Sequence, residues 1–235
     1  MNKLVIITGG TKGIGRALVY KFASEGFDVF TCARNREDLD SLKNTILSNY
    51  AGIQVFTQVA DVSNKKGREE VVRAFTQLNR AADVLINNAG VFVQGQIHNE
   101  PEGVLETQIQ TNLYSTYDIT RGVIGRMIEN KRGSIFNICS IASIMPYANG
   151  GSYSVSKFAM LGMTKVLREE MKPYNIRVTA VLPGATLTAS WDGVDLPEER
   201  FIKPEDVADS IFGIYKLSDH TVVEELLLRP QLGDI

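Results

Sequence analysis

The sequence has little of what disulfide-rich, metal-binding or histidine-dependent proteins contain. It holds two cysteines, two histidines and one tryptophan in 235 residues. Cys32 and Cys139 lie inside apolar, strand-like runs, so we expect buried free thiols rather than a disulfide. Free thiols fit a reducing cytoplasm, which is the expected location. His98 and His220 form no cluster with ligand spacing, so no metal site is expected.

Charge and hydropathy argue against two further classes of partner. The formal net charge of −2 gives no reason to expect nucleic acid or an anionic membrane. No apolar run is long enough to span a bilayer. The short apolar run that begins at residue 3 enters a glycine-rich turn, so it indicates a buried strand rather than a signal peptide. A chain of 235 residues, 44% hydrophobic, fits one large α/β domain over residues 1–235.

Strand-like and helix-like patterns alternate along the whole chain. Short apolar runs are typical of strands that are covered on both faces, and amphipathic runs separate them. The expected strands are residues 3–8, 28–33, 53–59, 83–86, 134–139, 176–182 and 222–228. The expected helices are residues 14–25, 36–48, 65–78, 101–128, 153–172 and 204–217, with Gly26 ending the first helix, and Gly122 and Gly125 weakening the end of the fourth. This order predicts a doubly wound parallel sheet of the Rossmann type, with about seven strands, helices on both faces and ligands at the carboxyl ends of the strands.

A glycine-rich turn, TGGTKGIG at residues 8–15, joins the first expected strand to the first helix. Small residues let the backbone approach a pyrophosphate, and the helix N-terminus supplies N–H donors and a positive dipole end. Gly9, Gly13 and Gly15 are spaced more widely than in the common dinucleotide motif. Such a turn also occurs as a plain tight turn, so on its own it is weak evidence for a nucleotide site.

Tyr153 and Lys157 lie four residues apart on an expected helix, so they share one face of it. The lysine charge is expected to favour phenolate and to bring the pKa of Tyr153 nearer to neutral. Ser140 ends an expected strand shortly before, where its hydroxyl can donate to a substrate oxygen. Each residue also has a plainer interpretation: an exposed lysine, a tyrosine that only packs, and a serine that completes a local turn.

Together these motifs resemble the short-chain dehydrogenases/reductases, in the shorter-chain branch of that family. The resemblance covers residues 1 to about 188 and rests on five features in the order the family has them. They are TGGTKGIG for the cofactor turn, Asp61-Val62 for the pair that touches adenine, NNAG at residues 87–90, the catalytic four Asn112, Ser140, Tyr153 and Lys157, and Pro183-Gly184 with Thr188 on the nicotinamide side.

The resemblance also implies roles for these residues. Asn112 is expected to kink its helix and to hold a water that relays protons to Lys157, although an exposed polar position is its plainer interpretation. Lys157 is expected to bond the cofactor ribose and to lower the pKa of Tyr153. The implied cofactor contacts are Gly9, Thr11, Lys12, Gly13, Ile14, Gly15, Arg34, Asp61, Val62, Asn88, Ala89, Gly90, Tyr153, Lys157, Pro183, Gly184, Thr186 and Thr188.

The residues after the second expected strand indicate which dinucleotide binds. Many folds that use NAD place an acid there, against the ribose 2′-hydroxyl. Ala33 holds that position here, and Asp28 and Glu37 are wrongly placed to replace the acid. Arg34 follows at once and Lys12 lies in the glycine turn, so two cations flank the expected ribose. We therefore predict NADP(H) rather than NAD(H).

The predicted function is an NADPH-dependent oxidoreductase that interconverts a small or medium ketone or aldehyde and its alcohol by hydride transfer, with Tyr153 as proton donor or acceptor. One alternative is a catalytically silent module that senses NADPH. Another is an epimerase or dehydratase of sugar nucleotides from the longer branch of the family, which has a tighter glycine spacing. Family members commonly pair helices like those expected at 101–128 and 153–172, so a homodimer or homotetramer is expected.

Three stretches are expected to line the substrate pocket: residues 91–95, 141–147 and a flap at 185–203 that holds Trp191. They are mostly apolar, which favours an apolar or aromatic carbonyl compound. Phe92, Ile144 and Tyr147 fit a core equally well, and the flap fits an ordinary surface loop equally well. The flap looks shorter than in the family's 3-oxoacyl carrier-protein reductases. The C-terminal TVVEELLLRPQLGDI lacks their glycine-rich ending and looks more like members that reduce sepiapterin-type or other small carbonyls.

Overall fold

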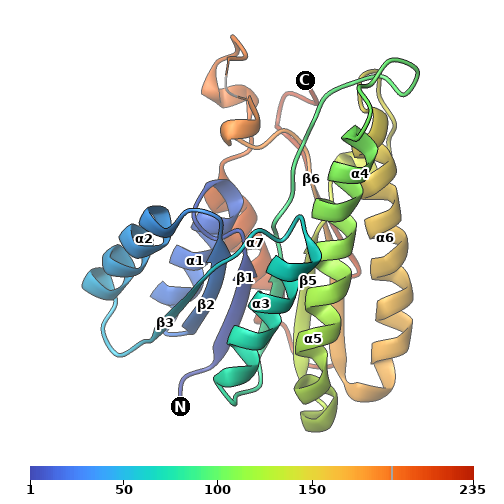
Figure 1. The fold of residues 1–235 in the computed structure, drawn as a ribbon. Helices are drawn as coiled ribbons and strands as arrows, with labels where there is room; N and C mark the ends of the chain where they lie inside the picture. The colour runs from blue at the N-terminus through green and yellow to red at the C-terminus, as the bar shows by residue number, and fades with distance from the viewer. Residues whose placement is uncertain (192) are drawn as a thin grey trace.

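A parallel sheet of seven strands lies between two layers of helices in the computed structural model, which describes residues 1–191 and 193–235 (Figure 1). Its strands lie in the order β3-β2-β1-β4-β5-β6-β7, and each neighbouring pair is parallel. They are β1 (Leu4–Thr8), β2 (Asp28–Ala33), β3 (Val55–Val59), β4 (Val84–Asn87), β5 (Gly133–Ile138), β6 (Ile176–Pro183) and β7 (Glu225–Leu228). The predicted doubly wound sheet is confirmed.

The helices divide between the two faces of the sheet. The α-helices are α1 (Gly13–Ser24), α2 (Arg36–Asn49), α3 (Lys65–Gln77), α4 (Val104–Gln108), α5 (Ser115–Asn130), α6 (Gly151–Met171) and α7 (Pro204–Tyr215). The shorter turns are the π-helix η1 (Ile109–Tyr114) and the 3-10 turns η2 (Ile141–Ser143), η3 (Lys172–Tyr174), η4 (Ala189–Trp191) and η5 (Glu198–Arg200). One apolar cluster joins α1, α2 and α7 to the sheet, and a second joins α3, α5 and α6 to its other face.

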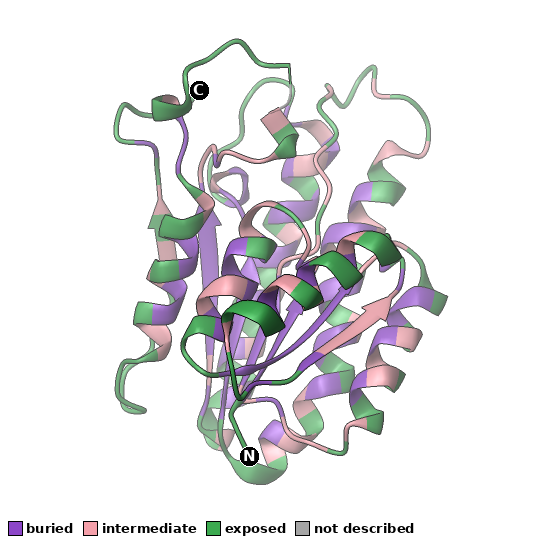
Figure 2. Cartoon of the chain, turned by 90° about the vertical axis from the view of Figure 1, so that its left-hand side faces the viewer, coloured by how far each residue is buried: buried purple, intermediate pink, exposed green. Residues whose placement is uncertain are grey.

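The central strands are buried on both faces, as their uninterrupted apolar runs predict (Figure 2). All residues of β1, β4 and β5 are buried. The edge strand β7 differs, because its side chains alternate between exposed and half-buried. Cys32 in β2 and Cys139 just after β5 are both buried free thiols, as predicted.

The expected helix at residues 101–128 is wrong in detail. The structure has α4, then the π-helical turn η1, and then α5, which runs past Gly122 and Gly125 to Asn130. Gly122 does not weaken this helix but allows α3 to approach it, since a Cβ there would lie 2.4 Å from a methyl carbon of Val72. Other boundaries move by a few residues, of which the start of β7 at residue 225 instead of 222 is the largest shift.

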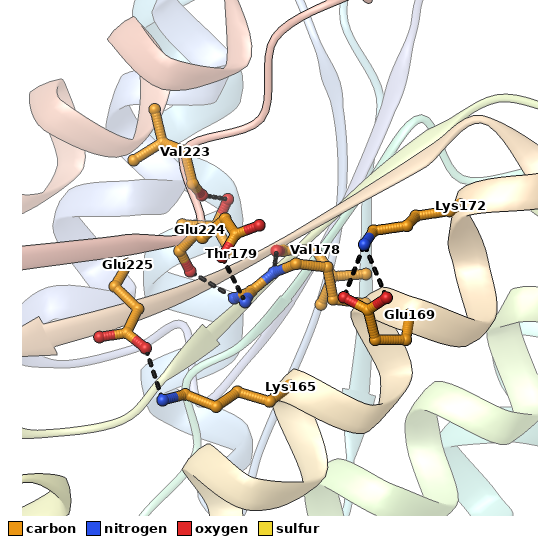
Figure 3. Close-up of polar contacts among 9 residues, drawn as sticks. Lys165, Glu169, Lys172, Val178, Thr179, Val223, Glu224 and Glu225 are labelled. Carbon is orange, nitrogen blue, oxygen red and sulfur yellow. Dashed lines mark hydrogen bonds and ion pairs between the residues drawn. The ribbon is translucent and has the colours of Figure 1, made fainter.

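Helix α6 is fixed to the edge of the sheet by Arg168, a buried arginine. Its Nε donates to the carbonyl oxygen of Val178 in β6 at 2.8 Å, and its Nη2 donates to the carbonyl oxygen of Glu224 at 2.5 Å (Figure 3). Lys165, one turn earlier on α6, forms an exposed ion pair with Glu225 at 2.9 Å. These contacts set the position of α6 relative to β6 and β7.

The strand order places a topological switch point at β1 and β4. These two strands are neighbours, but the chain continues from β1 towards β3 on one side and from β4 towards β7 on the other. Connections that leave the two strands therefore run in opposite directions, and ligands of open α/β sheets bind at the carboxyl ends of such strands.

Residues 185–203, the predicted flap, are fastened at their base. The N–H of Ile202 donates to the carbonyl oxygen of Ala185 at 2.8 Å, and the N–H of Leu187 donates to that of Ile202 at 2.9 Å. The rings of Trp191 and Phe201 lie 5.5 Å apart. Residue 192 of this segment lies outside the described residues. That the segment is a flap over the substrate stays a prediction.

Candidate active site

The glycine turn between β1 and α1 is shaped by close backbone contacts. Gly9 and Gly13 have φ values of +70° and +51°, which favour glycine. A Cβ on Gly15 would lie 2.1 Å from the carbonyl oxygen of Gly9, so a side chain there would push α1 away from the turn. The side chain of Asn88 crosses from the β4 loop and donates to the carbonyl oxygens of Thr8 and Gly9 at 2.9 and 3.2 Å. The predicted cofactor turn and the NNAG motif are therefore in direct contact.

Helix α1 begins within this turn, at Gly13. Its N-cap residue, Lys12, has an extended backbone, and no described side chain caps the helix there. The first N–H groups of α1 are thus left for an anion, which the positive end of the helix dipole attracts. Thr188 at the start of the flap reaches the same place, since a Cβ on Gly13 would lie 2.9 Å from its Cγ2.

Four charged side chains lie near the ends of β2 and β3. Lys12 forms an ion pair with Asp38 in the first turn of α2, with Nζ 3.5 Å from Oδ2. Burial acts to raise the pKa of Asp61, but hydrogen bonds from Ser63 and the positive charge of Arg34 lower it below its usual range. The charge of Arg34 thus acts on Asp61, and contact of the two residues with one adenosine stays a prediction.

Tyr153 and Lys157 lie one above the other on the first turns of α6. The Lys157 ammonium is 5.8 Å from the centre of the Tyr153 ring, and it donates to the carbonyl oxygen of Ile138 at 2.8 Å. Lys157 is only 5% exposed, which excludes the plainer interpretation of a surface lysine. Met160 lies below it, with its sulfur 3.9 Å from Nζ. The ammonium of Lys157 therefore lies between α6 and the end of β5.

Burial controls the proton affinity of both side chains. It raises the pKa of Tyr153 to about 12, although contact with the Ser140 hydroxyl acts in the opposite direction. It lowers the pKa of Lys157 to about 8. The prediction that the lysine brings the pKa of Tyr153 nearer to neutral is therefore wrong for this structure, because removal of the phenol from water is the largest effect on that pKa.

Asn112 lies in the π-helical turn η1, and it is fully buried. Its Oδ1 accepts the N–H of Val91 at 2.8 Å, while its Nδ2 donates to the carbonyl oxygen of Val91 at 3.0 Å and to Oγ of Ser156 at 2.9 Å. The expected interruption of the helix is thus present, and an exposed position is excluded. Gly90 lies next to both Asn112 and Lys157. A Cβ on Gly90 would lie 3.1 Å from Asn112 Oδ1 and 3.7 Å from Lys157 Nζ.

Ser140 follows β5 by two residues and begins the short turn η2. Its Oγ accepts the N–H of Ala142 at 3.1 Å, and its own N–H donates to Oγ of Ser143 at 3.2 Å. The local-turn interpretation is therefore correct for this serine, and it does not exclude the catalytic one. The turn holds the hydroxyl beside Tyr153, where it opposes part of the rise that burial causes in the pKa of the phenol.

The predicted pocket walls differ in how they pack. The ring of Phe92 meets the ring of Tyr153 edge-on, with centres 4.8 Å apart. Ile144 and Tyr147 are 42% and 41% exposed, so they are not core residues. Arg229, which directly follows β7, donates to the sulfur of Met145 at 3.6 Å. Of these residues, Phe92 contacts Tyr153 directly, and Arg229 joins the end of β7 to the segment that follows β5.

Sequence reasoning missed two contacts of this site. Ser156 holds Asn112 from the next turn of α6, and Glu100 bonds Ser152 directly before Tyr153. Both contacts join residues more than 40 positions apart, so no local sequence pattern predicts them.

The described part of the chain shows no group of three or more histidine, cysteine or acidic side chains that could hold a metal ion. Among the described residues, no helix combines the length and the apolar character that crossing a membrane requires.

Comparison with known proteins decides the family. The family model for short chain dehydrogenases matches residues 3–198. The chain belongs to the short chain dehydrogenase family. The resemblance stated from its motifs is thus confirmed, and the protein is an oxidoreductase of this family.

Relatives within the family act on different substrates. A sepiapterin reductase from Chlorobaculum tepidum is 31% identical, with 100% of this chain and 99% of the relative covered. A 3-oxoacyl-[acyl-carrier-protein] reductase from Thermotoga maritima is 34% identical, with 89% of each chain covered. A metagenomic short-chain oxidoreductase, solved in complex with NADP, has a TM-score of 0.84 and 29% identity over 97% of each chain. Other solved neighbours also contain NADPH.

Proposed function

We propose that this short-chain oxidoreductase uses NADP(H) to interconvert a small or medium ketone or aldehyde and its alcohol. One observation supports the proposal above all. The phenol of Tyr153 lies beside the hydroxyl of Ser140 and above the ammonium of Lys157, at the carboxyl ends of the strands and next to a glycine turn. That arrangement provides two donors for one substrate oxygen and a cation to support the phenol.

The glycine turn fits a dinucleotide. Gly9 and Gly15 have no side chains to cover the backbone at the start of α1, and that start has no side-chain cap. The exposed N–H groups there can bind a pyrophosphate. Asn88 stabilises the glycine turn through hydrogen bonds to the carbonyl oxygens of Thr8 and Gly9. A nicotinamide cofactor bound there would supply or accept the hydride, while the protein contributes orientation and electrostatics.

Two cations support the phosphorylated form of this cofactor. Arg34 and Lys12 flank the end of β2, where Ala33 offers no carboxylate to a ribose 2′-hydroxyl. Guanidinium can grip a phosphate through two parallel hydrogen bonds. The complexes of solved relatives with NADP or NADPH agree with this choice.

The acid–base roles follow from the pKa directions. With a pKa raised to about 12, Tyr153 holds its proton at neutral pH and can give it to a carbonyl oxygen that gains negative charge. Ser140 donates to the same oxygen. With a pKa of about 8, Lys157 is largely protonated at pH 7, so it stabilises the phenolate that Tyr153 leaves behind and can return a proton to it.

The pocket walls favour an apolar or aromatic carbonyl of modest size. Phe92, Ile144 and Met145 are apolar, and Phe92 packs directly against Tyr153. A small substrate agrees with the similarity to a sepiapterin reductase over 100% of this chain.

Oxidation of NADPH, followed by the loss of its absorbance, tests the proposal. The panel should contain small ketones and aldehydes, a sepiapterin-type hydroxy ketone and an acyl thioester, each also run with NADH. We expect turnover of a small carbonyl with NADPH. A catalytically silent sensor would bind NADPH tightly and oxidise none of the panel, and that result would overturn the proposal.

We also propose a homo-oligomer that pairs α5 and α6 of two copies. Tyr117 on α5 and Val155, Phe158 and Val166 on α6 are all more than 40% exposed. Large apolar side chains gathered on neighbouring helices commonly mark an interface. Light scattering should give a dimer or tetramer, and Phe158→Glu should shift it towards a monomer. A monomer for the unmodified chain would contradict the proposal.

A further inference from the structure

Glu100 lies at the N-terminus of α6, although it belongs to the segment that follows β4. Its Oε1 accepts the backbone N–H of Ser152 at 2.8 Å, and its Oε2 accepts the Ser152 hydroxyl. The two residues are 52 positions apart in the chain. Ser152 is buried and directly precedes Tyr153, so the contact lies one residue away from the proposed proton donor.

The start of α6 has no cap of its own. Gly150 occupies the N-cap position without a side chain, and the first turn contains no acid. The first N–H groups of a helix need acceptors, and a carboxylate also interacts favourably with the positive end of the dipole. Glu100 supplies both from a distant segment.

The backbone on both sides is shaped to admit this carboxylate. Gly151 has a φ of +34°, and a Cβ there would lie 1.9 Å from Glu100 Oε1. A Cβ on Gly95 would lie 2.6 Å from Glu100 Cγ. The N–H of Gly95 donates to the carbonyl oxygen of Asn149 at 3.1 Å, which joins the same two segments a second time. Two glycines thus open the space that one glutamate fills.

The segment that carries Glu100 also carries Phe92, whose ring packs edge-on against Tyr153. Tyr153 is therefore held on two sides by one segment, through its ring and through the residue before it. We propose that Glu100 is a positioning residue, whose carboxylate caps α6 through Ser152 and fixes Tyr153 at the angle that proton transfer requires. The proposal rests on the proposed function, because it takes Tyr153 as the proton donor.

Single-turnover kinetics with NADPH-saturated enzyme test the effect on chemistry. Glu100→Ala should lower the rate of the chemical step by about tenfold or more, because a displaced proton donor loses transition-state stabilisation. The Kd for NADPH should stay unchanged. Glu100→Gln should recover part of the rate, since its amide oxygen still accepts the Ser152 N–H. The matched control is Glu102→Ala, which removes an exposed acid of the same segment and should leave the rate unchanged.

Amide hydrogen exchange gives a readout that needs no substrate. The segment 150–155 should exchange faster in Glu100→Ala than in the unmodified protein and in Glu102→Ala. If no carbonyl is turned over while this difference appears, the proposed function fails and the cap stands. Unchanged exchange, or an unchanged chemical rate in Glu100→Ala, overturns the inference. If Glu100→Ala does not fold, Ser152→Ala provides the test instead. A chemical step slowed about threefold, with unchanged NADPH affinity, supports the inference about Glu100. An unchanged chemical step in Ser152→Ala overturns the inference.

Discussion

At the residue scale, burial moves the proton affinities of Tyr153 and Lys157 in opposite directions. The phenol pKa rises to about 12 and the ammonium pKa falls to about 8. Both groups therefore hold their protons at neutral pH, which suits the donation of a proton to a carbonyl. As the pH rises through about 8, Lys157 loses the charge that stabilises a phenolate, so the reduction should slow.

Tyr153→Phe should lower turnover by about 10²- to 10⁴-fold, the usual contribution of a positioned general acid. Its ring should still pack against Phe92, because the ring contact does not involve the hydroxyl. The Kd for NADPH, measured by fluorescence titration, should change little. Ordinary turnover in this variant would exclude Tyr153 as the proton donor.

Lys157→Met should stabilise the fold at neutral pH while it removes turnover. Folding lowers the pKa of Lys157 from 10.5 to about 8, so the unfolded chain binds more protons than the folded one between about pH 8 and pH 10.5. The charge therefore destabilises the fold, fully below pH 8 and progressively less towards pH 10.5. The net gain for Met is about 2 kcal/mol, after loss of the hydrogen bond to the Ile138 carbonyl is subtracted.

Urea unfolding at two pH values measures this effect. The stability difference between Lys157→Met and the unmodified protein should be largest near neutral pH and should shrink at a pH of about 10. A variant that is less stable at both values would show that the buried ammonium does not oppose folding.

Arg34→Ala should raise the KM for NADPH by about tenfold or more and leave that for NADH nearly unchanged, because only the 2′-phosphate needs the guanidinium. Arg36→Ala is the matched control. Arg36 is also an exposed arginine, but it is the first residue of α2, after the N-cap residue Asn35. Equal effects of the two substitutions would point to a general loss of positive charge. Initial rates with each cofactor decide between these outcomes.

At the scale of the elements, tertiary contacts shape the helix after β4 more than its own sequence does. Apolar periodicity predicts one continuous helix. In the structure, however, the side-chain amide of Asn112 accepts the N–H of Val91, donates to the carbonyl oxygen of Val91 and donates to the hydroxyl of Ser156. Those three bonds fix the π-helical turn η1. The turn places Asn112 against Gly90 and Lys157, so the irregularity lies where the site needs it.

Two glycines of α5 should respond to alanine in opposite ways. A Cβ on Gly122 would lie 2.4 Å from a methyl carbon of Val72 on α3, and nothing lies within 4 Å of a Cβ on Gly125. Gly125→Ala should therefore raise the free energy of unfolding by about 0.5–1 kcal/mol through helix propensity. Gly122→Ala should lower it by about 1–3 kcal/mol, because a stiff valine must shift. Equal and positive changes in urea unfolding would contradict the close approach of α3 and α5.

At the scale of the whole molecule, the sequence predicts what depends on short-range pattern and chemical spacing. The seven strands, the glycine turn and the pair Tyr153 and Lys157 all have local signals, and the structure has them where expected. The contact of Glu100 with Ser152 has none, because folding alone brings the two segments together. The pKa of Tyr153 could not be predicted either, since it depends on how far packing removes the phenol from water.

The edge of the sheet next to the site depends on one buried arginine. Strand β7 pairs only with β6 among the described strands, and its side chains are partly exposed. The N–H of Gly184, in the expected cofactor motif, donates to the carbonyl oxygen of Leu228 at 2.8 Å. Arg168 bonds the backbone of β6 and of the residue that precedes β7 (Figure 3). Loss of this arginine should therefore loosen β7 and, through it, Gly184.

Arg168→Met should destabilise the fold by about 2–4 kcal/mol, because the carbonyl oxygens of Val178 and Glu224 lose a buried donor. Lys165→Met removes an exposed ion pair between the same helix and the same strand, and should cost less than about 1 kcal/mol. Hydrogen exchange should quicken in β7 for Arg168→Met alone, and its NADPH affinity should fall because Gly184 is bonded to that strand. Equal losses in the two variants would mean that the charge facing β7, rather than the buried hydrogen bonds, holds α6 to the sheet.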